Sequence, residues 1–94
     1  MSTEIVVDLA LVDARPPLRA LADVILRWSD GELTIHRCAV FQKPGEPAWA
    51  NFPRLPVEKN GKKQFVPLVD LTRHLKYRAL EAVLKAYLAR SDAL

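Results

Sequence analysis

The last third of the chain carries the clearest hydrophobic pattern, in residues 70–90. Plotted at 3.6 residues per turn, its apolar residues fall on two neighbouring stripes. The stripe of mostly small residues is Leu71, Leu75, Ala79, Ala82 and Ala86, and the bulkier stripe is Tyr77, Leu80, Leu84, Tyr87 and Leu88. The pattern predicts a helix from Asp70, as its N-terminal cap, to Arg90. We expect one stripe to pack on a sheet and part of the other to meet a second copy of the chain.

Three earlier segments are candidates for β-strands. Residues 5–12 alternate apolar and polar positions, and residues 33–41 are also typical of a strand. Residues 18–28 fit a helix and a strand equally well by local pattern. The Asp30-Gly31 pair that follows them is a strong hairpin signal, and a hairpin needs a strand on each side. We therefore expect residues 18–28 to be extended.

The middle of the chain combines short apolar runs with proline and basic residues. Residues 48–52 predict a short strand, and residues 64–69 predict a last strand at a sheet edge or bulge. Residues 54–63, between them, are predicted to be a basic loop that turns at Asn60-Gly61. The sequence therefore predicts a single α+β domain over residues 1–94, in which a meandering antiparallel sheet of about five strands precedes a C-terminal helix.

Charge is distributed unevenly along the chain. The formal net charge is +3, with −2 in residues 1–42 and +5 in residues 43–94. Such asymmetry suggests a surface that faces a polyanion, the alternative being an ordinary solvated surface. The candidate nucleic-acid-binding residues are Arg54, Lys59, Lys62 and Lys63 on the predicted loop and Arg73, Lys76 and Arg78 near the helix start. We expect the loop to lie near the helix N-terminus, where N–H groups also favour phosphate, so that these cations form one surface.

Three aromatic residues are candidates for stacking on unpaired bases: Trp49, Phe52 and Tyr77. For Trp49 and Phe52, packing in the core is the commoner role of a strand aromatic.

No group of residues in the sequence predicts catalysis or cofactor binding. His36 and Cys38 lie two apart on a predicted strand and would share a face, but a zinc site needs four ligands and the chain has one cysteine. The sequence identifies no base for Cys38, the acidic residues are scattered, and no glycine-rich phosphate loop occurs. We therefore expect a protein that is not an enzyme and that takes no metal, cofactor or small-molecule substrate.

The expected location is the cytoplasm. A single cysteine excludes an internal disulfide, and a reducing compartment is the simplest home for such a chain. No run reaches the 18 apolar residues of a membrane span, and the N-terminus lacks a basic region followed by an apolar run. We expect no membrane partner.

Five short stretches, in chain order, connect this sequence to a known family. They are Arg19-Ala20, the strand 32–41, the stretch from Trp49 to Pro53, the Asn60-Gly61 turn with Phe65, and Ala82-Val83-Leu84 with Tyr87. Over about residues 7–88 the chain resembles the bacterial stage V sporulation protein G (SpoVG) family of septation proteins. The resemblance implies a dimeric α+β fold, binding of DNA and RNA, and a regulatory link to cell division or sporulation.

The resemblance also concerns the cations of the helix. Aligned on Ala82-Val83-Leu84, the family's helix Arg and Lys fall on Lys76 and Arg78, and Tyr77 replaces the glycine between them. The expected function is that of a small dimeric DNA- or RNA-binding regulator. The alternative is a protein-interaction module whose basic face docks an acidic partner, without binding nucleic acid.

Overall fold

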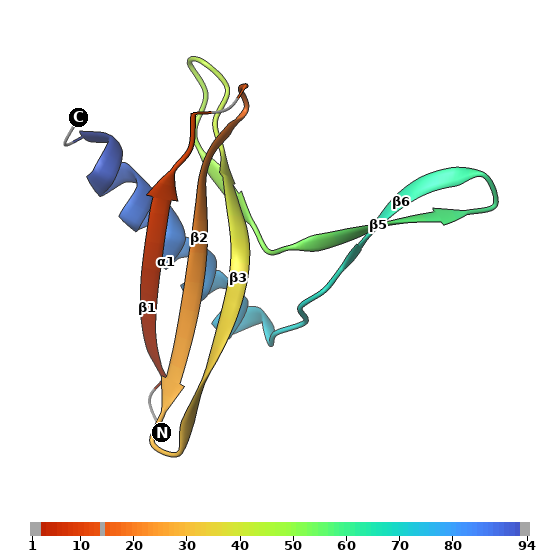
Figure 1. The fold of residues 1–94 in the computed structure, drawn as a ribbon. Coiled ribbons are helices and arrows are strands. Elements are labelled where there is room, and N and C mark those ends of the chain that lie inside the picture. The colour runs from red at the N-terminus through yellow and green to blue at the C-terminus, as the bar shows by residue number, and fades with distance from the viewer. Residues whose placement is uncertain (1–2, 14, 93–94) are drawn as a thin grey trace.

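The computed structural model describes residues 3–13 and 15–92, in which an α+β fold has six strands and one C-terminal helix (Figure 1). The elements are β1 (Glu4–Leu11), β2 (Leu18–Trp28), β3 (Gly31–Phe41), β4 (Trp49–Asn51), β5 (Arg54–Lys59), β6 (Lys62–Pro67) and α1 (Arg73–Asp92). An antiparallel sheet contains β1 to β4 in chain order, and β5 and β6 form a separate antiparallel hairpin. The α+β class is confirmed, whereas the expectation of one sheet of about five strands is corrected.

The extended state of β2 is confirmed. It pairs with β1 on one side and with β3 on the other, which places it in the middle of the sheet. Its side chains alternate, and those of Ala20, Ala22, Val24 and Leu26 are at most 2% exposed. This burial against α1 is what distinguishes the strand from the helix that the local pattern also allowed.

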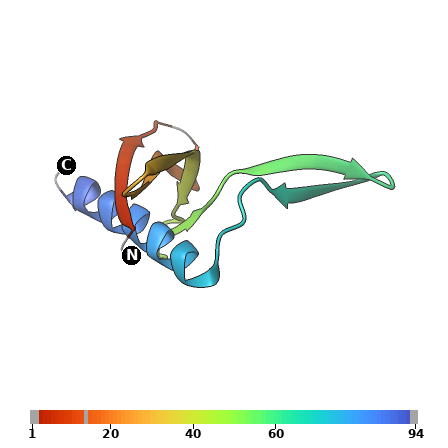
Figure 2. The ribbon, with the colours of Figure 1, turned by 90° about the horizontal axis from the view of Figure 1, so that it is seen from below.

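Helix α1 covers one face of the four-stranded sheet, as the view from below shows (Figure 2). Its most buried residues are Ala79, Val83 and Tyr87, at positions i, i+4 and i+8. This line runs between the two predicted stripes, and its central residue, Val83, belongs to neither of them. Tyr77 and Leu88, from the bulkier stripe, remain exposed.

The helix starts later than the sequence predicts. The first helical hydrogen bond runs from the N–H of Lys76 to the carbonyl oxygen of Thr72, at 2.9 Å. Thr72 is therefore the N-cap, and the prediction of Asp70 in that role is wrong. The first turn contains no acidic residue, so Arg73 and Lys76 lie near the positive end of the helix dipole without a compensating carboxylate in that turn.

The predicted basic loop of residues 54–63 is instead the greater part of a β-hairpin. Asn60 and Gly61 have φ angles of 55° and 76°, and Lys59 pairs directly with Lys62. Two positive φ angles in a two-residue connection are typical of a type I′ turn, whose twist suits paired strands. The loop prediction is wrong because the apolar alternation in this segment is limited to Leu55 and Val57 and is obscured by proline and basic residues.

This hairpin projects from the rest of the fold (Figures 1 and 2). In the described part of the chain, β5 and β6 contact each other but no other strand and not α1. Its root is closed by a hydrogen bond from the N–H of Leu68 to the carbonyl oxygen of Pro53, at 3.2 Å. We call β1 to β4 with α1 the body. Within the described residues, the helix is not apolar enough along its length to span a membrane.

Candidate functional site

All seven of the predicted binding cations are exposed, but the structure divides them between several places. Three lie at the far end of the hairpin, and we call these the tip cations: Lys59, Lys62 and Lys63. Two lie where the hairpin leaves the body, and we call these the root cations: Arg54 and Lys76. The remaining two, Arg73 and Arg78, lie on α1.

The tip cations are held close together by the strand pairing. Lys59 and Lys62 are direct partners across the turn, and Lys63 follows opposite Glu58. Like charges on facing positions repel each other, so this arrangement weakens the turn in the absence of an anion. The tip is five residue pairs from the root, a separation of about 17 Å along the strands.

The root cations come from segments that are far apart in the sequence. Arg54 begins β5 and Lys76 lies in the first turn of α1, and both line one small hollow of about 70 Å³. Part of the predicted juxtaposition of the middle segment with the helix start is therefore present in the fold, in these two residues.

The other two helix cations point elsewhere. The guanidinium carbon of Arg73 lies 5.9 Å from the centre of the Tyr77 ring, in a cation–π contact. Arg78 donates from Nη2 to the carbonyl oxygen of Thr3, at 3.1 Å. Residues two apart on a helix differ by about 200° in direction, so Lys76 and Arg78 face different edges of the sheet. The expectation of one continuous cationic surface is therefore wrong for a single chain.

The hairpin has two chemically different faces, because partners across an antiparallel pair share a face and neighbours along a strand alternate. The inner face consists of Arg54, Pro56, Glu58, Lys63, Phe65 and Pro67, and the outer face of Leu55, Val57, Lys59, Lys62, Gln64 and Val66. Arg54 and Phe65 line a hollow together with residues of β2 and β3, which turns the inner face toward the sheet.

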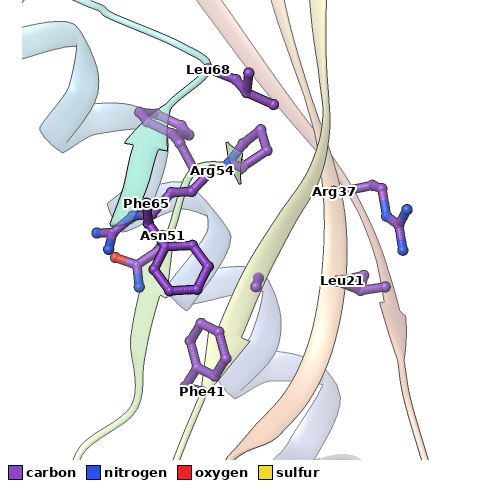
Figure 3. Close-up of a pocket in the computed structure, with 10 residues that line it drawn as sticks. Leu21, Arg37, Phe41, Asn51, Arg54, Phe65 and Leu68 are labelled. Atoms are coloured by element: carbon purple, nitrogen blue, oxygen red, sulfur yellow. The ribbon is translucent and has the colours of Figure 1, made fainter. Parts of the chain in front are cut away.

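That hollow is a groove between the hairpin and the open face of the sheet, the face away from α1. It has a volume of about 500 Å³, and its lining residues are Leu21, Arg37, Ala39, Phe41, Asn51, Phe52, Pro53, Arg54, Phe65 and Leu68. Figure 3 shows Phe65, Arg54 and Asn51 on one side of β3, with Arg37 on the other side in this view. Sequence reasoning missed this groove. The Asn60-Gly61 pair was the available signal, because it is as strong a hairpin signal as Asp30-Gly31.

A bulge in β3 decides which residues reach the groove. Ala22 pairs with Cys38 but Val24 pairs with Ile35, so β3 has one extra residue opposite Asp23. Arg37, in this bulge, has a φ of 64°, which a residue other than glycine adopts only at a cost. Its N–H donates to Oδ1 of Asp23 at 3.4 Å.

The same bulge overturns the prediction that His36 and Cys38 share a face. Cys38 is fully buried in the core, whereas His36 is exposed and lies with Nδ1 3.2 Å from Oδ1 of Asp23. Burial, reinforced by the Asp23 carboxylate, raises the pKa of the Cys38 thiol to about 12. A thiol that stays protonated at neutral pH is a poor nucleophile. In the described ranges, no three His, Cys, Asp or Glu side chains come together as a metal site.

The three candidate stacking aromatics have different surroundings. Phe52 belongs to the core, as the commoner role of a strand aromatic predicts. The ring of Trp49 stacks on that of Phe41, with 5.6 Å between the centroids and 24° between the planes. Tyr77 is 62% exposed and carries Arg73 on its ring.

Comparison of the chain with protein-family models, with curated proteins and with solved structures gives no match. The resemblance to the SpoVG family therefore stays a prediction made from the sequence, and the functional argument rests on the chain's own geometry.

Proposed function

We propose that this chain is a small nucleic-acid-binding regulatory protein that acts as a homodimer. The observation that carries the proposal is the exposed set of five cations along the projecting hairpin and at its root. Lysine and arginine side chains on an exposed arm can follow a phosphate backbone, which supplies most of the affinity in non-specific binding. The sequence resemblance adds DNA and RNA as ligands and a role in septation, cell division or gene regulation in bacteria, and the single cysteine adds the cytoplasm as the location.

The two groups of cations have different parts in this proposal. The tip cations are flexible lysines, which suit contact with phosphates. The root cations include Arg54, whose planar guanidinium can bind a phosphate through two donors at once. Because the two groups are about 17 Å apart along the hairpin, one strand of nucleic acid can contact both.

A second copy of the chain is proposed to cover only the apolar part of the outer face of the hairpin, next to its root, which leaves Lys59 and Lys62 at the tip free to contact phosphates. Leu55 and Val66 lie on this face and are 47% and 37% exposed, and no element of the body contacts it. An isolated two-stranded hairpin is only marginally stable in water, so an apolar partner surface would stabilise it. Sedimentation at micromolar concentration should give a dimer, and Leu55→Asp should shift it toward the monomer.

The binding test is a fluorescence anisotropy series across salt concentrations, with duplex DNA, single-stranded DNA and RNA. Wild type should lose affinity steeply as salt rises. Removing all three tip lysines (Lys59→Ala, Lys62→Ala, Lys63→Ala) should lower the salt slope by roughly 0.7 to 0.9 for each phosphate that the variant no longer neutralises. Lys43→Ala, which removes an exposed lysine of the β3–β4 turn, is the matched control and should leave the slope unchanged.

The helix cations allow a second comparison. Lys76→Ala should weaken binding more than Arg78→Ala, because Lys76 lies beside Arg54 whereas Arg78 donates to Thr3. If wild type binds no nucleic acid at any salt concentration but binds an acidic polypeptide such as polyglutamate, the chain is instead a protein-interaction module with a basic face.

A further inference from the structure

The groove under the hairpin is lined by apolar and aromatic side chains, which binding to phosphates alone would not require. Most of its lining is apolar, and its polar groups are the Asn51 amide and the guanidinium groups of Arg37 and Arg54. No acidic residue lines it, and among the described residues no carboxylate lies within ion-pair distance of either guanidinium. An apolar hollow whose only charges are positive is complementary to a ligand with a flat apolar body and anionic ends.

Two aromatic rings are available inside this groove. Phe65, on the inner face of the hairpin, is 65% exposed although it is a large apolar side chain. Phe41, on β3, has one face of its ring covered by the stacked ring of Trp49. Aromatic side chains of this kind are the platforms on which unpaired bases stack, and every base presents a face that suits them.

The bulge in β3 contributes the third element. In a regular strand, residue 37 would share a face with Ile35, whose side chain is in the core. The extra residue moves Arg37 to the open face, at the price of a positive φ. Strained residues of this kind often occur at binding sites, where a side chain must be re-aimed.

We propose that this groove binds one unpaired base of a single-stranded DNA or RNA. The base stacks on Phe65 or Phe41 with its edge toward Asn51, and the flanking phosphates meet Arg37 and Arg54. The inference rests on the proposed function and deepens it. The tip cations hold the phosphates of any nucleic acid, and the groove adds a preference for unpaired strands.

The first test compares the affinities of the full chain for a fluorescent thymine or uracil oligomer and for a duplex of the same length. Phe65→Ala should weaken binding to the single strand about 5- to 100-fold, the usual effect of removing a stacking aromatic. Duplex affinity should change less than twofold. Phe65→Trp should retain the single-strand preference, and Leu33→Ala is the matched control, because Leu33 is an exposed apolar residue of β3 that does not line the groove. Circular dichroism and melting curves verify that each variant is folded.

Arg37→Gly is a second variant, chosen because glycine accepts the positive φ without strain. It should lower single-strand affinity several-fold without loss of thermal stability. If the guanidinium has no part in binding, affinity will be unchanged and the assignment of Arg37 to a phosphate will be wrong.

The second test locates the base directly. Oligomers that contain 5-iodouracil, in separate DNA and RNA arms, are photocrosslinked to wild type and the modified peptide is identified by mass spectrometry. Crosslinks at Phe65 or Phe41 support the proposal. Crosslinks confined to α1 overturn it.

The outcomes separate this inference from the proposed function. If Phe65→Ala binds single strands like wild type while the tip variant loses affinity, the groove assignment fails and the proposed function stands. If wild type binds no nucleic acid, both fail. If Phe65→Ala converts a dimer into a monomer and weakens single-strand and duplex binding equally, the groove is an interface between copies of the chain and the base site is refuted.

Discussion

The body and the hairpin of this protein use the same antiparallel pairing, but only the body buries side chains. In β2, every second side chain is closed off by α1, whereas all six residues of β6 are exposed. Burial of apolar surface is the main source of folding free energy, so the body can fold on its own contacts and the hairpin cannot. The comparison indicates that the body supplies the stability of the fold, whereas the hairpin adds exposed surface.

The largest expected difference between the two regions lies in amide hydrogen exchange. Amides of the β2–β3 ladder should exchange only on global unfolding, which costs about 5–15 kcal/mol in domains of this kind. The β5–β6 pairing should open with a free energy near zero in the monomer, so its amides should exchange fast. Exchange followed by mass spectrometry at several protein concentrations measures both. If the β5–β6 amides are as strongly protected as the β2–β3 amides at the lowest protein concentration, the expected difference in stability between hairpin and body is wrong.

Core truncation should show the next largest effect. Leu26 is fully buried between β2 and α1, and Leu26→Ala should lower the free energy of unfolding by about 2–5 kcal/mol. Val66→Ala in the hairpin should change it by less than about 0.5 kcal/mol, because the side chain is already partly in water. Urea denaturation of both variants at low protein concentration makes the comparison. Similar losses would mean that the hairpin packs against the body in solution.

Alkaline pH should destabilise the body through Cys38. Its pKa is raised from 9.0 to about 12 in the fold, so the unfolded chain loses this proton at a lower pH than the folded chain does. The stability that the protonated thiol allows is therefore fully present below pH 9, and the free energy of unfolding falls by about 1.4 kcal/mol per pH unit as the pH rises toward 12. Denaturation curves at several pH values test this. In Cys38→Ala, the free energy of unfolding should not fall in this way between pH 9 and 12. If it falls as much as in wild type, other titrating groups cause the loss of stability.

The smallest expected effect is in the turn of the hairpin. Gly61 has a φ of 76°, so Gly61→Ala should destabilise the hairpin by about 1 kcal/mol. Gly31→Ala, in the other hairpin connection, is the control because Gly31 has no positive φ and its added Cβ would meet no atom within 4 Å. Nuclear magnetic resonance shifts of the β5–β6 amides should move toward random-coil values in the first variant alone. If these shifts move equally in Gly31→Ala, the positive φ of Gly61 is not what stabilises the hairpin.

Local pattern in the sequence determined the parts of the fold that depend on neighbouring residues. The Asp30-Gly31 pair predicted the β2–β3 hairpin, and apolar periodicity predicted a C-terminal helix that starts within three residues of its observed start. These predictions succeeded because turn geometry and side-chain periodicity are properties of short segments.

Tertiary structure alone decided the bulge at Arg37, the burial of Val83 and the restriction of the expected cation cluster to Arg54 and Lys76. Each of these depends on which segment lies against another, and no local pattern contains that information. A one-residue bulge exchanges the faces of every residue that follows it, which is why His36 and Cys38 separated. The groove under the hairpin is likewise a product of two segments that the sequence keeps apart.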